Sequence, residues 1–257
     1  VQYDKKYFGE PNLEVCMDCN LGFANPMPIE NKVAEYYKNI YRSAGRPHYE
    51  NPKSPPLPNH IHLGIMNNLS SIVDLSHVST ILEIGAGSEP HISYIKSKDF
   101  SYYILEKSKY RSQITKSKSG KIFYKYYNGK NIPFKPNTFD RIIISHTLEH
   151  IPDPEFFIKE MMKVLKKGGV LSISLPTDPG LFYRISRMVN KIFSFNSKLK
   201  MSALEYDYSN AIEHINSIFN LVNIIRYNYK KKITESFLPF KVKLIDLNLF
   251  YNVHIVK

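Results

Sequence analysis

A glycine turn with an acidic partner is the strongest chemical signal in the sequence. Gly85 and Gly87 end the apolar stretch 79–87, and glycines after a strand let the backbone turn tightly and let a ligand approach it. Glu106 ends a second apolar stretch, at about the 20-residue distance from Gly87 that suits a carboxylate binding ribose hydroxyls. The pattern therefore predicts a site for a ligand that contains ribose.

The same turn argues against a dinucleotide. Glu89, followed by Pro90, takes the place of the third glycine of a dinucleotide fingerprint. A carboxylate there repels a pyrophosphate at the N-terminus of the next helix. A cofactor that has no phosphate and carries a positive sulfonium tolerates carboxylates at Glu83 and Glu89.

A second group of polar side chains lies in the segment 145–150, Ser-His-Thr-Leu-Glu-His. Ser145 and His146 end an apolar stretch, and open α/β sheets bind ligands at the carboxyl ends of their strands. Histidine is the usual general base near neutral pH. We therefore expect His146 or His150 to act as a base or to orient a substrate, with His214, in a probable helix, as a further candidate base.

Cys16 and Cys19 form a Cys-x2-Cys pair, and they are the only cysteines of the chain. A tetrahedral zinc site needs four ligands, and the spacing of His48, His60 and His62 from the pair matches no known pattern. A redox dithiol is not expected, because the pair does not open a helix after a strand. We expect two reduced cysteines in a small hairpin.

Alternating strands and helices must position these motifs. The clearest helix is expected over 154–166, with Phe157, Met161, Val164 and Leu165 facing inward. Strands that alternate with helices predict an α/β fold with a Rossmann-like, doubly wound, mostly parallel sheet. The expected strands lie at 79–87, 102–107, 121–127, 139–147 and 168–176.

The chain divides into four parts. Residues 1–75 form an N-terminal extension with the cysteine pair and a proline-rich loop, and residues 76–180 form the ligand-binding core. Residues 181–230 form a helical region, expected to be a lid that contacts substrate. Its basic, amphipathic stretch 181–200 suits a lid or core helix, or, as a further alternative, a lipid surface. Residues 231–257 supply strands that complete the sheet as an edge hairpin.

Composition narrows the choice of partners. Lysine and arginine number 35 against 23 aspartates and glutamates, a net charge of +12, which favours an anionic partner. Nucleic acid is not expected, because the lysines are scattered and no Asn/Asp-Pro-Pro-aromatic motif follows the fourth strand. No apolar run reaches the about 18 residues of a membrane span, and the N-terminus has no apolar signal core. We expect a reducing, cytoplasmic protein.

The motifs together closely resemble those of class I S-adenosylmethionine-dependent methyltransferases. The resemblance runs from about residue 79 to residue 176, and its most specific part is 132–169, from Ile-Pro-Phe through Leu-Glu-His-Ile to Gly-Gly. It implies that fold, a methyltransferase activity and S-adenosylmethionine as the cofactor. The cofactor contacts that it implies are Glu83, Gly85, Gly87, Glu106, Asn128 and Ser145.

The resemblance also gives these residues roles. Glu83 would lie near the methionine amino group and Glu106 would bind the ribose hydroxyls. Asn128 stands where many relatives have an aspartate that meets the adenine amine, and an amide oxygen is a weaker acceptor.

Metal binding is an alternative for the histidine segment. His146, Glu149 and His150 are the residue types of two-histidine, one-carboxylate metal sites, and ubiquinone-pathway O-methyltransferases carry ligands at the matching positions, with Glu in place of His146. Many relatives with Leu-Glu-His need no metal, so we expect none. Asp178 could also reach a substrate, although a cap of its loop is the simpler role.

The N-terminal segment indicates an acceptor class. Residues 15–28 resemble the second half of a zinc-binding module that precedes some sugar methyltransferases, enzymes often tied to surface polysaccharides. We therefore expect O-methylation of a small anionic acceptor: a sugar, a nucleotide-sugar or a phosphate or phosphoramidate precursor of a surface polysaccharide such as a capsule. A nucleic-acid methyltransferase and a non-catalytic cofactor-binding protein are the alternatives.

Overall fold

The computed structural model describes the chain in separate stretches. These are residues 12–15, 22–25, 64, 67–70, 78–86, 91–95, 99–106, 120–127, 131–194 and 214–257.

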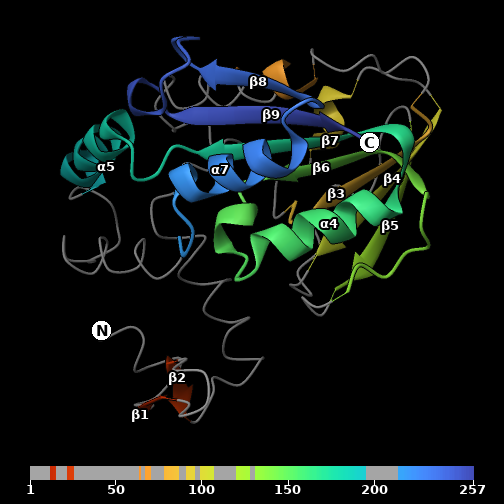
Figure 1. Cartoon of the computed structure of the whole chain (residues 1–257), viewed down its shortest axis with the longest axis horizontal. Coiled ribbons are helices and arrows are strands. Elements are labelled where there is room, and N and C mark those ends of the chain that lie inside the picture. Colours follow the sequence, from red (N-terminus) through yellow and green to blue (C-terminus); the bar gives the residue numbers. More distant parts are fainter. Residues whose placement is uncertain are drawn as a thin grey trace.

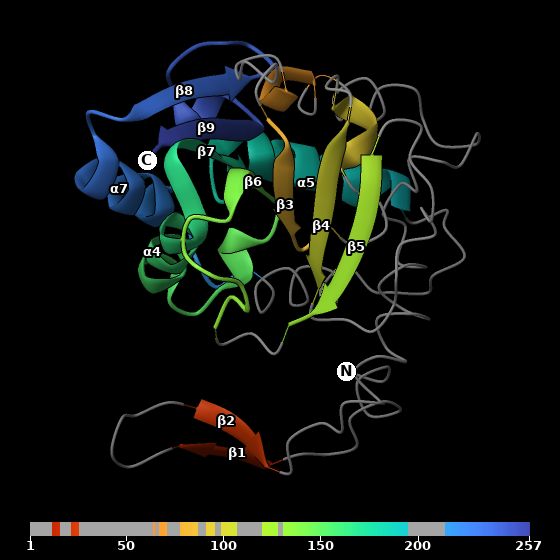
Figure 2. The ribbon, with the colours of Figure 1, turned by 90° about the vertical axis from the view of Figure 1, so that its right-hand side faces the viewer.

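One large sheet forms the centre of the structure (Figures 1 and 2). Its strands are β3 (Thr80–Ile84), β4 (Phe100–Glu106), β5 (Gly120–Tyr126), β6 (Phe139–Ser145), β7 (Leu165–Pro176), β8 (Ile233–Leu238) and β9 (Phe250–Val256). Their order is β5-β4-β3-β6-β7-β9-β8, with β3 to β7 parallel and β9 antiparallel to both neighbours. The predicted Rossmann-like, doubly wound and mostly parallel sheet is confirmed.

Helical segments cover both faces of this sheet. α4 (Pro154–Val164) and α7 (Ile218–Tyr229) pack on one face, where they bury the larger apolar core (Figure 2). The short 3-10 helix η2 (His91–Tyr94) and the helical residues 67–70 contribute to the smaller core on the other face. α5 (Leu181–Ser194) lies beyond the carboxyl ends of the parallel strands instead (Figure 1).

Local chemistry explains where α4 begins. Asp153 accepts a hydrogen bond from the Phe156 N–H at 2.9 Å, and Pro154 fills the first helical position. The predicted helix 154–166 extends too far, because Leu165 already begins β7. The residues predicted to face inward are nevertheless all buried: Phe157, Met161, Val164 and Leu165.

The region 181–230 differs from its prediction in two respects. His214 precedes α7 rather than lying on a helix, because Ser217 caps α7 by accepting a hydrogen bond from the Asn220 N–H at 3.3 Å. Four apolar side chains of α5 (Leu181, Ile185, Met188 and Val189) are exposed, so α5 is not the core helix that was one of its expected alternatives.

The C-terminal strands β8 and β9 form an antiparallel pair at one edge of the sheet, as expected. β9 lies inside the sheet, between β7 and β8, and only β8 is at the edge. The 3-10 helix η4 (Ile245–Leu247) lies in the connection between these two strands. β9 is buried along most of its length, because strands flank it on both sides.

At the amino ends of the parallel strands, Asp140 joins three strands. Its Oδ2 accepts from the Thr80 hydroxyl at 2.7 Å and from the Thr80 N–H at 2.9 Å, and its Oδ1 pairs with the Lys166 Nζ at 2.8 Å. Partial burial raises the pKa of Asp140, but the hydrogen bonds from Lys166 and Thr80 outweigh it and bring the pKa to about 2. These bonds hold β3, β6 and β7 together.

The N-terminal part contains a small antiparallel pair, β1 (Asn12–Val15) and β2 (Gly22–Asn25). Cys16 and Cys19 fall between these strands, outside the described residues. Across the described part of the chain, no helix is long and apolar enough to span a membrane.

Candidate active site

Several parallel strands end at one edge of the sheet and bring the predicted cofactor residues to it. Ile84 of β3 pairs with Leu105 of β4 and with Ile144 of β6. Because parallel strands in register end side by side, the residues that follow lie along a common edge. These residues are Gly85, Glu106 and Ser145.

Gly85 can only be a glycine, for two reasons. Its φ of +72° is in the left-handed region, which side chains disfavour. A Cβ at this position would also collide with the side chain of Thr147, the residue that follows the end of β6 by two positions. The Gly85 N–H donates to the Leu105 carbonyl at 3.0 Å, so the turn is tied to β4 as well. The glycine turn therefore contacts the loop that carries the histidine segment.

The side chains at this edge fit a nucleoside-type cofactor. The Ser145 Oγ is buried and has no hydrogen-bond partner among the described residues, and an unpaired buried hydroxyl costs about 1–3 kcal/mol, which a bound ligand can recover. Glu106 places a half-buried carboxylate on the neighbouring strand, where it can accept from hydroxyls. Gly87 and Asn128 lie outside the described residues, so their predicted contacts stay predictions.

The carboxyl group of Glu83 accepts its hydrogen bonds from other residues of the protein. Its side chain is 2% exposed, and its carboxyl group accepts hydrogen bonds from the His91 N–H at 3.0 Å and from the Tyr102 hydroxyl at 2.8 Å. Burial raises the pKa of Glu83 to about 7, although the bonds from Tyr102 and His91 oppose the rise. The structure therefore gives Glu83 a part in fixing η2, next to the glycine turn. Its contact with the methionine amino group stays a prediction.

Glu83 should make stability depend on pH. Because its pKa rises from 4.5 to about 7 on folding, the folded state holds this proton more tightly. The stabilisation is full below pH 4.5 and is lost as the pH rises to about 7, a loss of order 3 kcal/mol in the free energy of unfolding. Glu83→Gln should abolish this slope, measured by urea unfolding of both proteins from pH 4.5 to 7.5.

The wild type also contains an opposing group, so the comparison must be a difference. Burial lowers the pKa of His254 to about 4, which makes the protein more stable as the pH rises. This contribution is common to wild type and Glu83→Gln and cancels in their difference. An identical pH slope in the two proteins would show that Glu83 ionises normally.

His214 lies in a hydrogen-bonded pair with Asp178. The His214 Nδ1 is 2.8 Å from the Asp178 Oδ2, and both side chains are largely buried. An ionised carboxylate only accepts, so Nδ1 carries the proton and Nε2 is the basic nitrogen. The Arg187 Nη1 of α5 is 3.4 Å from the same Asp178 oxygen, which fixes the carboxylate further. Asp178 thus orients His214 as well as leading the chain into α5.

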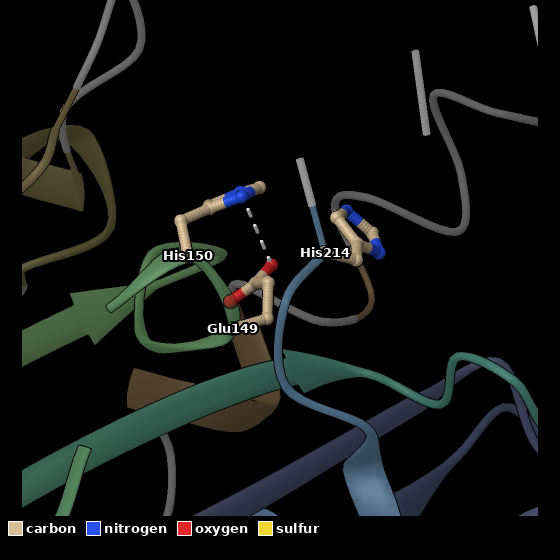
Figure 3. A group of neighbouring side chains, drawn as sticks. All are labelled: Glu149, His150 and His214. Carbon is tan, nitrogen blue, oxygen red and sulfur yellow. Dashed lines mark ion pairs between the residues drawn. The ribbon is translucent and has the colours of Figure 1, made fainter. Parts of the chain in front are cut away.

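His150 and Glu149 complete a cluster around His214 (Figure 3). The rings of His150 and His214 are 5.1 Å apart, and the His150 Nε2 is 3.8 Å from the Oε1 of Glu149, which is 3% exposed. Potential ligand atoms of the three residues lie within 4.8 Å of one another, a set that suits a divalent metal. The sequence pattern groups His146 with Glu149 and His150 as possible metal ligands, whereas in the structure the third member of the group is His214. The expected absence of a metal stays a prediction.

His146 is not a member of this cluster and makes contacts of its own. Its φ is +49°, its N–H donates to the Ser174 carbonyl at 3.0 Å, and its ring lies edge-on to Phe250 at 5.3 Å between centroids. It remains at the carboxyl end of β6, next to Ser145. Its role as base or substrate-orienting residue stays a prediction.

Hydrogen bonds of Asn216, a residue that the sequence analysis did not single out, hold the segment of His214 at the cluster. The Asn216 N–H donates to the Glu149 carbonyl at 3.1 Å, and the Asn216 side-chain amide donates to the Ile151 carbonyl at 2.6 Å. These two bonds fasten the segment before α7 to the turn η3 (Leu148–His150). A lone asparagine in a loop carries no local signal for such a contact.

Comparison with known proteins agrees with this arrangement. Residues 82–173 match the family model described as a methyltransferase domain. This part of the chain is similar to a methyltransferase domain. Its match spans the glycine turn, the histidine segment and all of α4, and it ends within β7, so the fold around the site is that of class I S-adenosylmethionine-dependent methyltransferases.

Curated relatives of the methyltransferase domain carry names from quinone biosynthesis. The chain is 36% identical over 85 residues to the ubiquinone/menaquinone biosynthesis C-methyltransferase UbiE of Haemophilus ducreyi, covering 33% of this chain and 32% of that protein. It is 31% identical over 119 residues to the demethylmenaquinone methyltransferase of Streptomyces griseus, covering 42% and 49%. The chain thus spans less than half of the length of these two relatives.

Solved structures share the fold at low identity. The plantazolicin methyltransferase BpumL, in complex with a monoazolic desmethylPZN analogue and SAH, has a TM-score of 0.58 and 13% identity, with 89% of this chain and 95% of that chain covered. A possible histamine N-methyltransferase from Thermotoga maritima has a TM-score of 0.50 and 18% identity, with 88% and 95% covered. None of these names supports the expected sugar or polysaccharide acceptor.

Proposed function

We propose that this protein is an S-adenosylmethionine-dependent methyltransferase that acts on a hydroxylated aromatic ring of the quinol class, with His214 as the general base. The observation that carries the proposal is the His214–Asp178 pair, which lies beside the sheet edge that would bind the cofactor. The family match and the methyltransferase structural neighbours support S-adenosylmethionine as the cofactor. The quinol class is supported by the names of the curated relatives.

The residues at this edge of the sheet would each have a different role in binding the cofactor. Glu106 would hold the ribose hydroxyls, the Ser145 hydroxyl would find its missing partner, and Gly85 would leave the backbone accessible. When bound, S-adenosylmethionine supplies an electrophilic methyl group on a sulfonium.

His214 would prepare the acceptor. Its Nε2 takes the proton of a ring hydroxyl while Asp178 stabilises the imidazolium that forms, so the ring becomes an anion with enhanced electron density on its oxygen and on the neighbouring ring carbons. Such an anion is the nucleophile needed for either C- or O-methylation. His150, 5.1 Å from His214 between ring centroids, would help to position the acceptor hydroxyl.

A direct assay tests the proposed function. Wild-type protein is incubated with methyl-labelled S-adenosylmethionine and, separately, with a water-soluble short-chain demethylmenaquinol, a sugar nucleotide and a transfer RNA. We expect the label in the quinol alone. Label in the sugar nucleotide would establish the expected polysaccharide-type acceptor instead, and label in the RNA would establish a nucleic-acid methyltransferase. Cofactor binding without any label would favour a non-catalytic role.

A further inference from the structure

α5 presents an apolar face to solvent. Leu181, Ile185, Met188 and Val189 recur at helical spacing on one side, and Met188 is 64% exposed. A surface helix normally turns such a face toward the core, but α5 lies beyond the strand ends (Figure 1). The helix therefore keeps four large apolar side chains accessible.

The connection between β8 and β9 extends this apolar surface. Four of its side chains are also exposed, and contacts join the connection to α5: the Phe182 and Phe240 rings are 5.4 Å apart, and the Leu181 N–H donates to the Asp246 Oδ1 at 3.0 Å. We call the combined surface the α5–η4 patch. Its apolar members are Leu181, Ile185, Met188, Val189, Phe240, Val242, Leu244 and Leu247.

The charges around the α5–η4 patch are mostly positive. Arg184, Lys241 and Lys243 are exposed among its apolar side chains. In α5 and the described connection, the only acidic residue is Asp246, whose carboxylate caps the first turn of α5. Large apolar side chains with interspersed cations are the composition of a surface that rests at the headgroup level of an anionic bilayer.

The α5–η4 patch adjoins the candidate active site. Arg187 of α5 pairs with Asp178, and the Tyr183 ring is 6.4 Å from the His214 ring. The same helix therefore carries exposed apolar side chains and contacts to the proposed base. An acceptor held in a bilayer would meet the site from this side.

We propose that the α5–η4 patch docks the protein on an anionic membrane surface and that the acceptor is taken from the lipid phase. The second half of this statement rests on the proposed function, whereas the docking stands on the patch itself. The apolar side chains enter the headgroup region, and Arg184, Lys241 and Lys243 lie against lipid phosphates.

Vesicle binding tests the docking. The whole chain is sedimented with vesicles of phosphatidylcholine and phosphatidylglycerol in a 3:1 ratio, and with pure phosphatidylcholine. We expect binding to the anionic vesicles, weakened by salt, and a loss of at least about tenfold in the double variant Ile185→Glu/Met188→Glu. Tyr227→Glu is the matched control, because Tyr227 is 89% exposed on α7, outside the patch, and should bind as wild type does.

Two further measurements distinguish a failure of the docking proposal from a failure of the proposed function. Affinity for S-adenosylhomocysteine and turnover of the short-chain quinol should be unchanged in Ile185→Glu/Met188→Glu, whereas turnover of a long-chain quinol in anionic vesicles should fall about as far as vesicle binding does. The proposal would be overturned if the wild type did not bind anionic vesicles, or if the double variant bound them as the wild type does. A dimer of the wild type that the double variant abolishes would assign the patch to a second copy of the chain instead.

Discussion

His214→Ala should lower turnover by about 10²–10⁴-fold, the usual contribution of a general base. The variant removes the nitrogen that takes the proton, while the residues at the glycine turn and the ends of β3, β4 and β6 are untouched. Affinity for S-adenosylhomocysteine should therefore stay within about twofold of wild type. Single-turnover kinetics with the short-chain quinol and calorimetric titration of the cofactor product measure the two quantities.

Asp178→Asn shows whether His214 acts through its ionised partner. An amide can neither hold the required tautomer nor stabilise an imidazolium, so the rate should fall and the pH at which turnover reaches half its maximum should shift. His150→Gln is the neighbouring control and should change KM more than kcat. Equal turnover in wild type and His214→Ala would exclude this base. Turnover that a chelator abolishes and Zn²⁺ or Mn²⁺ restores would show that the cluster of Glu149, His150 and His214 acts through a metal.

Glu106→Ala should weaken binding of S-adenosylmethionine and S-adenosylhomocysteine by about 100-fold or more, since each hydrogen bond to a charged group contributes about 1.5–3 kcal/mol. Glu106 ends β4 directly beside the glycine turn, where a carboxylate can accept from both hydroxyls of a ribose. The prediction is checked by calorimetric titration of wild type and variant. Turnover at saturating cofactor should change far less than affinity does.

Two glutamate variants control for charge and for folding. Glu155→Ala removes the same charge from the surface of α4, where Glu155 pairs with Lys159, and should leave cofactor affinity unchanged. Glu106→Gln keeps the length of the side chain but loses the charge, so its affinity should lie between those of wild type and Glu106→Ala. Wild-type affinity in Glu106→Ala would place the ribose elsewhere on the edge.

Patterns within short segments were enough to predict the core of this fold. The apolar stretches, the glycine turn and the capped helix that begins at Pro154 are each determined by neighbouring residues, through side-chain periodicity, backbone freedom at Gly85 and the side chain of Asp153. Because the strands are parallel and in register, their motifs had to meet at one edge, which made Glu106 and Ser145 predictable as neighbours of the turn.

Contacts between distant segments decided the rest. His214 meets His150 only because Asn216 fastens its loop to η3 and Asp178 arrives from the end of β7, and no local pattern encodes such pairings. The amphipathic pattern of α5 is equally compatible with a helix that buries its apolar face in the core and with a helix that places this face in a membrane. Only the position of α5 beyond the strand ends leaves that face exposed, since side-chain periodicity records which residues share a face and not what covers it.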